Sequence, residues 1–244
     1  MLSKTDERNT LDQDYFKILV SLPVSARRWL QCALPEDFNL PGRVTLDQKG
    51  EMEIRGRWTP FKARGVYSSP PLSFNWQARL HMLPGVWIVA EDGHANGQGW
   101  GGAKLWGLLS MGKRTDPEVL ATQVIRNIGE LPLLPMFAVT DPNLEWSAAG
   151  ENSFEVRSSV GDVEVMVRFE VDEEGDVVSA YSPSRPYDTP EGYAEAPWKY
   201  EFSDHREFGR VRIPAMAVAT YEKDDGAWEY FRGRIMSVTF EAGE

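Results

Sequence analysis

Cysteine is nearly absent from this sequence, since Cys32 is the single one among 244 residues. One thiol excludes an intrachain disulfide, so the fold has to depend on a hydrophobic core, which a chain of this length can provide. Cys32 lies in an apolar pattern of helical period. We therefore expect it to be a small core residue rather than a nucleophile.

Long hydrophobic runs are missing as well. No run in the sequence approaches the roughly 18 apolar residues of a membrane-spanning helix. The first residues, "MLSKTDERNTLDQDYF", are polar and charged and lack the apolar stretch of a signal peptide. These absences predict a soluble, cytoplasmic protein without an integral membrane segment, in which residues 1–10 form a flexible N-terminus.

Positive charge is scarce. The chain has 26 Lys and Arg against 37 Asp and Glu, a formal net charge of −11, and a pI of about 4.9. A protein that binds nucleic acid needs clustered Lys and Arg along the phosphate backbone, and here the acidic excess is spread along the chain. The sequence therefore predicts no nucleic-acid partner, and an anionic membrane surface would repel the molecule as a whole.

Histidine is also rare, with His81, His94 and His205 alone. No two of them stand at the i, i+2 or i, i+4 spacing of metal-ligand motifs, and no Gly-x-Ser-x-Gly nucleophile elbow is present. The run from Ser203 to Phe208 holds Ser, Asp, His, Arg and Glu, but neighbours along a strand point to opposite faces. We therefore predict no catalytic residue, no metal site and no cofactor.

The stretch from Glu91 to Lys113, "EDGHANGQGWGGAKLWGLLSMGK", is rich in glycine and raises the question of a phosphate-binding loop. A P-loop ends in Gly-Lys-Ser/Thr and opens a helix, whereas Lys104 is followed by a strand-like segment. Gly97, Gly99 and Gly102 imitate a dinucleotide fingerprint, again without a helix after them. The stretch instead indicates bent sheet, in which the glycines make room for the neighbouring Trp100 and Trp106.

Apolar spacing predicts three helices. Two amphipathic patterns occupy residues 11–22 and 24–34, separated by Pro23 and followed by Pro35. A third helix over 116–131 begins with Asp116 as N-cap and Pro117 at the first helical position. The proline-rich "LPLLPMF" that follows is expected to pack as an apolar lid or turn.

From Arg43 onward the apolar period changes to two, and segments of strand length alternate with turn residues. The pattern predicts about ten antiparallel strands, with turns at Lys49-Gly50 and Asp225-Gly226 and a surface loop from Pro183 to Pro197. No βαβ alternation and no linker are present. We therefore expect a single α+β domain over residues 11–244, in which a large curved antiparallel sheet surrounds the third helix.

Aromatic residues make up 11% of the chain. Several predicted strands are apolar on both faces and must be covered on both sides. Alanines that alternate with aromatic residues, at Ala215, Ala217 and Ala219, can leave room in a barrel-like interior. The expected ligand-binding residues are four aromatic side chains that would line the cavity and two cations that could orient a polar head group: Trp76, Trp100, Trp106 and Trp198, with Arg79 and Lys104.

An ordered series of segments resembles a bacterial family that is known only as a domain of unknown function. The series includes "PPLSFNWQARL", "DGHANGQGWGGAKLWGLL", "IGELPLLPMF", "VRFEVDEEGDV", "APWKYEFSDHREFGRVRIP" and "YFRGRI", and it covers most of residues 20–241. The resemblance implies a half-barrel sheet like that of LolA-type lipoprotein carriers. In the family that the chain resembles, tyrosine is favoured where this chain has His94 and His205, which implies aromatic rather than metal-ligating positions.

Three functions remain open at this point. The leading hypothesis is a non-enzymatic module that binds an apolar or lipid-like small molecule in an aromatic cavity of the half-barrel. The alternatives are an interaction or scaffold protein with a filled core and, behind it, an uncharacterised hydrolase. The sequence carries no signal of an oligomeric state.

Overall fold

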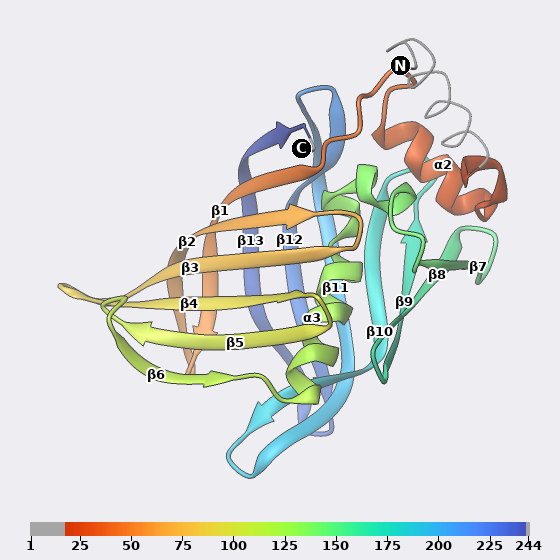
Figure 1. Ribbon diagram of the computed structural model, residues 1–244. Coiled ribbons are helices and arrows are strands. Elements are labelled where there is room, and N and C mark those ends of the chain that lie inside the picture. Colours follow the sequence, from red (N-terminus) through yellow and green to blue (C-terminus); the bar gives the residue numbers. More distant parts are fainter. Residues whose placement is uncertain (1–17, 243–244) are drawn as a thin grey trace.

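The computed structural model describes residues 18–242, and one antiparallel sheet dominates it (Figure 1). The expected N-terminal tail at 1–10, and the first expected helix up to residue 17, lie outside the described residues. The second expected helix is present as α2 (Val24–Ala33) and packs its Trp29 and Leu30 into the core. Within 18–242, no helix has the length and apolar character needed to cross a bilayer.

Thirteen strands form the sheet, in the spatial order β6-β5-β4-β3-β2-β1-β13-β12-β11-β10-β9-β8-β7. Their bounds are β1 (Arg43–Ile54), β2 (Arg57–Ser68), β3 (Ser73–Leu83), β4 (Val86–Ala95), β5 (Gln98–Leu105), β6 (Leu109–Arg114), β7 (Glu145–Ala148), β8 (Ser153–Val160), β9 (Val163–Val171), β10 (Val177–Thr189), β11 (Gly192–Phe208), β12 (Val211–Lys223) and β13 (Gly226–Glu241).

The sheet curls around α3 (Pro117–Gly129), which lies against its concave side (Figure 1). The prediction of an α+β half-barrel wrapped around a central helix is therefore confirmed, with thirteen strands in place of about ten. After α3 the chain continues in two short 3-10 helices, η1 (Leu131–Leu133) and η2 (Pro135–Val139). Every residue of both is buried, so "LPLLPMF" closes part of the concave side with apolar side chains.

The glycine-rich stretch is sheet, as predicted, because it forms β4, β5 and the turn between them. Gly99 faces α3: a Cβ atom there would lie 2.5 Å from Leu120 Cα. A side chain larger than hydrogen would therefore push the helix away from β5. The glycine allows a close approach of backbone to backbone, which is a common use of glycine within strands.

The expected turn at Lys49-Gly50 is wrong. β1 continues through Gly50, which pairs with Phe61 on one side and Gly233 on the other. The turn lies later, at Arg55-Gly56, where both residues have positive φ. Gly50 serves close approach instead, since a Cβ atom there would stand 1.9 Å from the Arg232 carbonyl oxygen.

The expected surface loop from Pro183 to Pro197 is also wrong, because this segment forms the paired ends of β10 and β11. The ladder is regular from Arg185 to Thr189, with a register shift between Ser182 and Arg185. Proline cannot donate to a ladder and is tolerated at a bulge. A bulge also re-aims the side chains next to it, and Arg185 comes to lie buried in the interior.

His94 of β4 helps to anchor α3 to the sheet. It is 4% exposed, packs edge-on against Phe74 with ring centroids 5.5 Å apart, and lies with its Nε2 2.8 Å from Asn127 Nδ2 of α3. Since an amide nitrogen can only donate, this contact requires a neutral ring whose Nε2 accepts. Burial lowers the pKa of His94 to about 4.

Replacing Gly50 with alanine should destabilise the protein, because the new methyl group would overlap the Arg232 carbonyl. We expect the free energy of unfolding to fall by at least the roughly 1–3 kcal/mol typical of overpacking. Urea titration measures the change. The control is Gly150→Ala in an exposed bend, where the nearest atom is the movable hydroxyl of Ser153. Equal stability of the two variants would contradict the packing argument.

His94 should make stability depend on pH. In the unfolded chain a histidine has a pKa of about 6.5, so the unfolded state takes up a proton there while the folded state takes it up near 4. Stability attributable to His94 is therefore intact above pH 6.5 and decreases by about 3 kcal/mol as the pH falls to 4. Relative to His94→Phe, the wild type should lose more stability over this range in urea titrations. A difference between the two proteins that stays constant with pH would refute the assignment.

Candidate ligand-binding pocket

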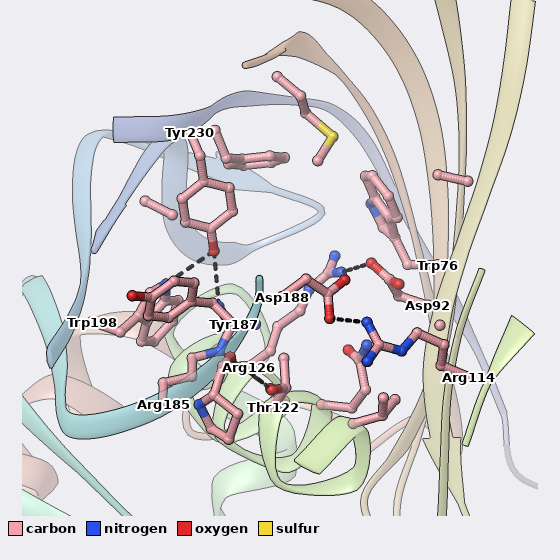
Figure 2. Close-up of a pocket in the computed structure, with 18 of the residues that line it drawn as sticks. Trp76, Asp92, Arg114, Thr122, Arg126, Arg185, Tyr187, Asp188, Trp198 and Tyr230 are labelled. Carbon is pink, nitrogen blue, oxygen red and sulfur yellow. Dashed lines mark hydrogen bonds and ion pairs between the residues drawn. The ribbon is translucent and has the colours of Figure 1, made fainter. Parts of the chain in front are cut away.

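A pocket of about 500 Å³ lies on the concave side of the sheet, beside α3. Its lining comes from β3, β4 and β5 on one side, β10 to β13 on the other, and α3 between them (Figure 2). Nine aromatic residues line it. They are Trp76, Tyr187, Tyr193, Trp198, Tyr200, Tyr221, Trp228, Tyr230 and Phe231.

Small side chains create the room. Ala63, Ala78, Ala90 and Ala103 are direct cross-strand partners and form one row across β2, β3, β4 and β5. The last two of them line the pocket. On the opposite wall Ala219 lies between its partners Tyr200 and Phe231. The expected alternation of alanine with aromatic residues is thus present at Ala219, and it leaves space beside the rings.

The aromatic wall on the β11–β13 side is continuous. The Tyr221 ring stacks on Trp228 with centroids 5.8 Å apart, and Tyr230 lies 5.3 Å from each of these two rings. Trp198, 1% exposed, contacts Tyr200 at 5.4 Å. Such a wall offers a large and rigid apolar surface that loses little conformational entropy when a ligand covers it.

Arg126 of α3 forms a paired charge network in the pocket. Its Nε donates to Glu130 Oε1 at 2.9 Å and its Nη1 donates to Asp92 Oδ2 at 3.1 Å. Glu130 also accepts a hydrogen bond of 2.8 Å from the Tyr67 hydroxyl of β2. The guanidinium stands 4.7 Å from the centre of the Trp76 ring. Helix and sheet are therefore joined by a largely buried cluster in which Arg126 pairs with two carboxylates.

Asp92 and Gln123 supply polar groups next to this network. Burial raises the pKa of the Asp92 carboxyl, against the lowering effects of Arg126, Arg185 and a hydrogen bond from Gln123. The Gln123 amide oxygen is buried and has no hydrogen-bond partner among residues 18–242. Gln123 lines the same pocket.

Arg185 of β10 is the second cation of the pocket, and it differs from Arg126 in its partners. Its Nη1 donates to the hydroxyls of Tyr221 and Tyr230 at 2.7 and 3.0 Å, and its Nε donates to the Thr122 carbonyl oxygen at 3.3 Å. It stands 4.8 Å from the centre of the Trp198 ring. All of these partners are uncharged.

The rim of the pocket is closed by contacts between β6 and the β10–β11 hairpin. Arg114, at the end of β6, pairs with Asp188 of β10 (Figure 2) and lies 4.1 Å from the centre of the Tyr193 ring. The Tyr193 hydroxyl donates to Asp116 at 2.8 Å, so this carboxylate, expected to cap α3, makes no capping bond. Burial and this hydrogen bond raise the pKa of Tyr193 to about 12.

Of the six expected ligand-binding residues, the structure brings Trp76 and Trp198 into the pocket. Trp100 lies over its cross-strand partner Gly93. Gly93 follows the inward-pointing Asp92 in the sequence, so Gly93 and Trp100 are on the outer face of the sheet. The three others are exposed: Arg79 stacks on Trp87 outside the sheet, Lys104 follows the inward Ala103, and Trp106 lies in the turn after β5. In this pocket, orientation of a polar head would depend on other cations.

Residues of the pocket that the sequence analysis missed are the arginines and tyrosines. One signal was available for α3, because Gln123, Arg126 and Glu130 recur at helical spacing on a single face, beside the apolar stripe. No comparable signal marks Arg185, which is surrounded by prolines and serines in "YSPSRPYD". The bulge that turns it inward is a property of the ladder and leaves no periodic pattern.

The rare residues considered for chemistry lie away from the pocket. His94 contacts Asn127, while His205 Nε2 lies 3.1 Å from the Val177 carbonyl oxygen. Cys32 is half-buried beside Asp176, and burial raises the pKa of its thiol. In the part of the chain that the structure describes, no group of three His, Cys, Asp or Glu side chains could hold a metal ion.

Comparison with solved structures finds similar folds at very low sequence identity. A putative outer membrane lipoprotein-sorting protein domain from Vibrio parahaemolyticus has 9% identity and a TM-score of 0.45, with 83% of this chain and 87% of that chain covered. A LolA superfamily protein from Nitrosomonas europaea has 8% identity and a TM-score of 0.46, covering 91% and 96%. A DUF1329 family protein from Desulfovibrio piger has 10% identity and a TM-score of 0.43, covering 90% and 92%.

In sequence, no curated protein matches the chain. A family model does match, over residues 17–233, and its description is "Family of unknown function (DUF6544)". The match spans the α2 helix, the pocket and all strands up to the middle of β13. The resemblance to a family of unknown function is therefore confirmed, and the chain belongs to the DUF6544 family.

Proposed function

We propose that this protein is a non-enzymatic binding module that takes an apolar or amphipathic small molecule, such as a lipid, into the pocket of its half-barrel. The observation that carries the proposal is the aromatic pocket of about 500 Å³ on the concave face. Small-molecule sites typically have volumes of about 300–1,000 Å³ and are lined by apolar and aromatic side chains with a few polar groups. The pocket has this size and this chemistry.

Binding would be driven by burial of apolar ligand surface, which contributes about 25 cal/mol per Å². The alanine row provides a smooth floor, and the rings of Trp198, Tyr221 and Trp228 provide the facing wall. Because both surfaces belong to hydrogen-bonded strands, the pocket is largely formed before a ligand enters, and little ordering entropy is lost on binding.

The two alternative functions have less support. A scaffold with a filled core would bury the aromatic residues against other side chains, whereas here the alanines leave a pocket beside them. A hydrolase needs a nucleophile or a free base, and of the described residues that line the pocket none is serine, cysteine or histidine. Asp92 and Glu130 are both engaged by Arg126, and burial raises the pKa of Tyr200 and Tyr221 further above that of a free phenol.

Filling the pocket should abolish binding. Ala90 lies in the middle of the alanine row, between its partners Ala78 and Ala103, so Ala90→Phe would place a ring in the space that a ligand needs. We expect the affinity for the apolar fluorophore N-phenyl-1-naphthylamine to fall at least tenfold, which is measured by fluorescence titration.

The matched control is Val89→Phe, which adds a ring on the adjacent residue of the same strand but on the outer face. It should bind the fluorophore like the wild type. Equal affinity of the Ala90 variant and the wild type would show that the fluorophore binds elsewhere. If the wild type does not bind it at all, and native mass spectrometry finds no co-purifying small molecule, the proposal fails.

A further inference from the structure

Arg185 is a buried cation without a counter-ion. It is 5% exposed, and no carboxylate of residues 18–242 lies within 4.0 Å of its guanidinium, whereas Arg126 in the same pocket has two carboxylate partners. Arginine stays charged in proteins. Burial of an unpaired charge is costly and is normally relieved by an ion pair or by a ligand.

The protein compensates this charge only in part. Two tyrosine hydroxyls and one carbonyl oxygen accept hydrogen bonds from Nη1 and Nε, and the Trp198 ring lies under the guanidinium. Nη2 has no hydrogen-bond partner in the described part of the chain. The two N–H groups of Nη2 can therefore donate to an oxygen of a carboxylate or a phosphate, and a charge-assisted hydrogen bond of this kind is stronger than a neutral one.

Tyr230 supplies a second donor beside it. Its hydroxyl oxygen accepts from Trp198 Nε1 and from Arg185 Nη1, each at 3.0 Å. With both acceptor positions occupied, its own proton is left to donate, and no residue of 18–242 accepts it. The neighbouring Tyr221 differs, because its hydroxyl proton goes to the Pro186 carbonyl oxygen at 3.0 Å.

The charges of the pocket are arranged asymmetrically. Figure 2 shows Arg185, Trp198 and Tyr230 grouped on one side, with Asp92 and Trp76 on the other. Arg126 is neutralised by Asp92 and Glu130. An anionic group is therefore attracted to the Arg185 side and repelled from the Asp92 side, while the alanine row and the rings accept an apolar chain.

From this geometry we infer that the ligand is an amphiphile with an anionic head group, a carboxylate or a phosphate, and that Arg185 Nη2 and the Tyr230 hydroxyl bind this head while the tail occupies the aromatic part of the pocket. This inference rests on the proposed function, since it names the ligand class of the same site. It concerns the head group alone, so it can fail while the proposed function stands.

Competition with N-phenyl-1-naphthylamine at pH 7 tests the inference on the wild-type protein. The competitors share one alkyl chain and differ in the head group: dodecanoate, dodecyl phosphate, dodecanol and dodecyltrimethylammonium, each below its micelle concentration. We expect the inhibition constant of one or both anions to be at least tenfold lower than that of dodecanol, and the cation to be the weakest competitor. The tighter anion identifies the head as carboxylate or phosphate.

Variants assign the effect to the two residues. Arg185→Gln should bind the fluorophore and dodecanol but lose the preference for anions. Tyr230→Phe keeps the ring, and its preference for anions over dodecanol should be at least threefold smaller than that of the wild type. Arg79→Gln, an exposed arginine on the outer face, should retain the full preference and serves as the matched control. Should Arg185→Gln fail to fold, the wild-type comparison and Tyr230→Phe still decide.

Three results would overturn the inference. If dodecanol competes as well as both anions, or if Arg185→Gln and Tyr230→Phe both keep the wild-type preference, the head group is not recognised as inferred, and the proposed function remains. If the wild type binds neither the fluorophore nor any of the four amphiphiles, the proposed function and the inference fail together.

Discussion

The ion-pair cluster around Arg126 holds the central helix in the half-barrel, and the pocket depends on it. Arg126 and Glu130 come from α3, Tyr67 from β2 and Asp92 from β4. Buried ion pairs contribute little net stability because desolvation offsets the attraction, but they demand one geometry. A helix fixed by an all-apolar stripe could slide into any free space on the concave face. Here the polar face of α3 fixes its position instead.

The distance between helix and sheet is then set by the smallest side chains. At Gly99 the absence of a Cβ atom lets β5 contact the backbone of Leu120, which brings α3 close to one end of the strand. Ala103 follows Gly101 on the inward face of β5 and ends the alanine row. Its short side chain keeps this wall of the pocket thin. Close approach at one point and short side chains at the next leave a pocket in a structure whose core is otherwise tightly packed.

The sequence predicted those features that have a periodic or steric signature. The helices at Val24–Ala33 and Pro117–Gly129, the sheet nature of the glycine-rich stretch and the inward position of Trp76 all follow from spacing. Trp100 was misplaced because glycines surround it, so that few large apolar neighbours reveal which face of β5 is inside. Arg185 was missed because its neighbouring prolines are typical of loops, whereas Pro183 lies in a bulge of the ladder and Pro186 is paired within it, and bulges depend on the partner strand.

A net charge of −11 does not conflict with an anionic ligand, because dissolved salt screens electrostatic interactions over distance. At physiological ionic strength the screening length is about 8 Å, so most of the acidic surface is screened from a group inside the pocket. An anionic group in the pocket would interact with Arg185 at short range and at a low dielectric constant. The attraction between the two charges is much stronger there than at the surface. The overall negative charge would slow the association of an anionic ligand, and the buried Arg185 would determine which ligand remains bound.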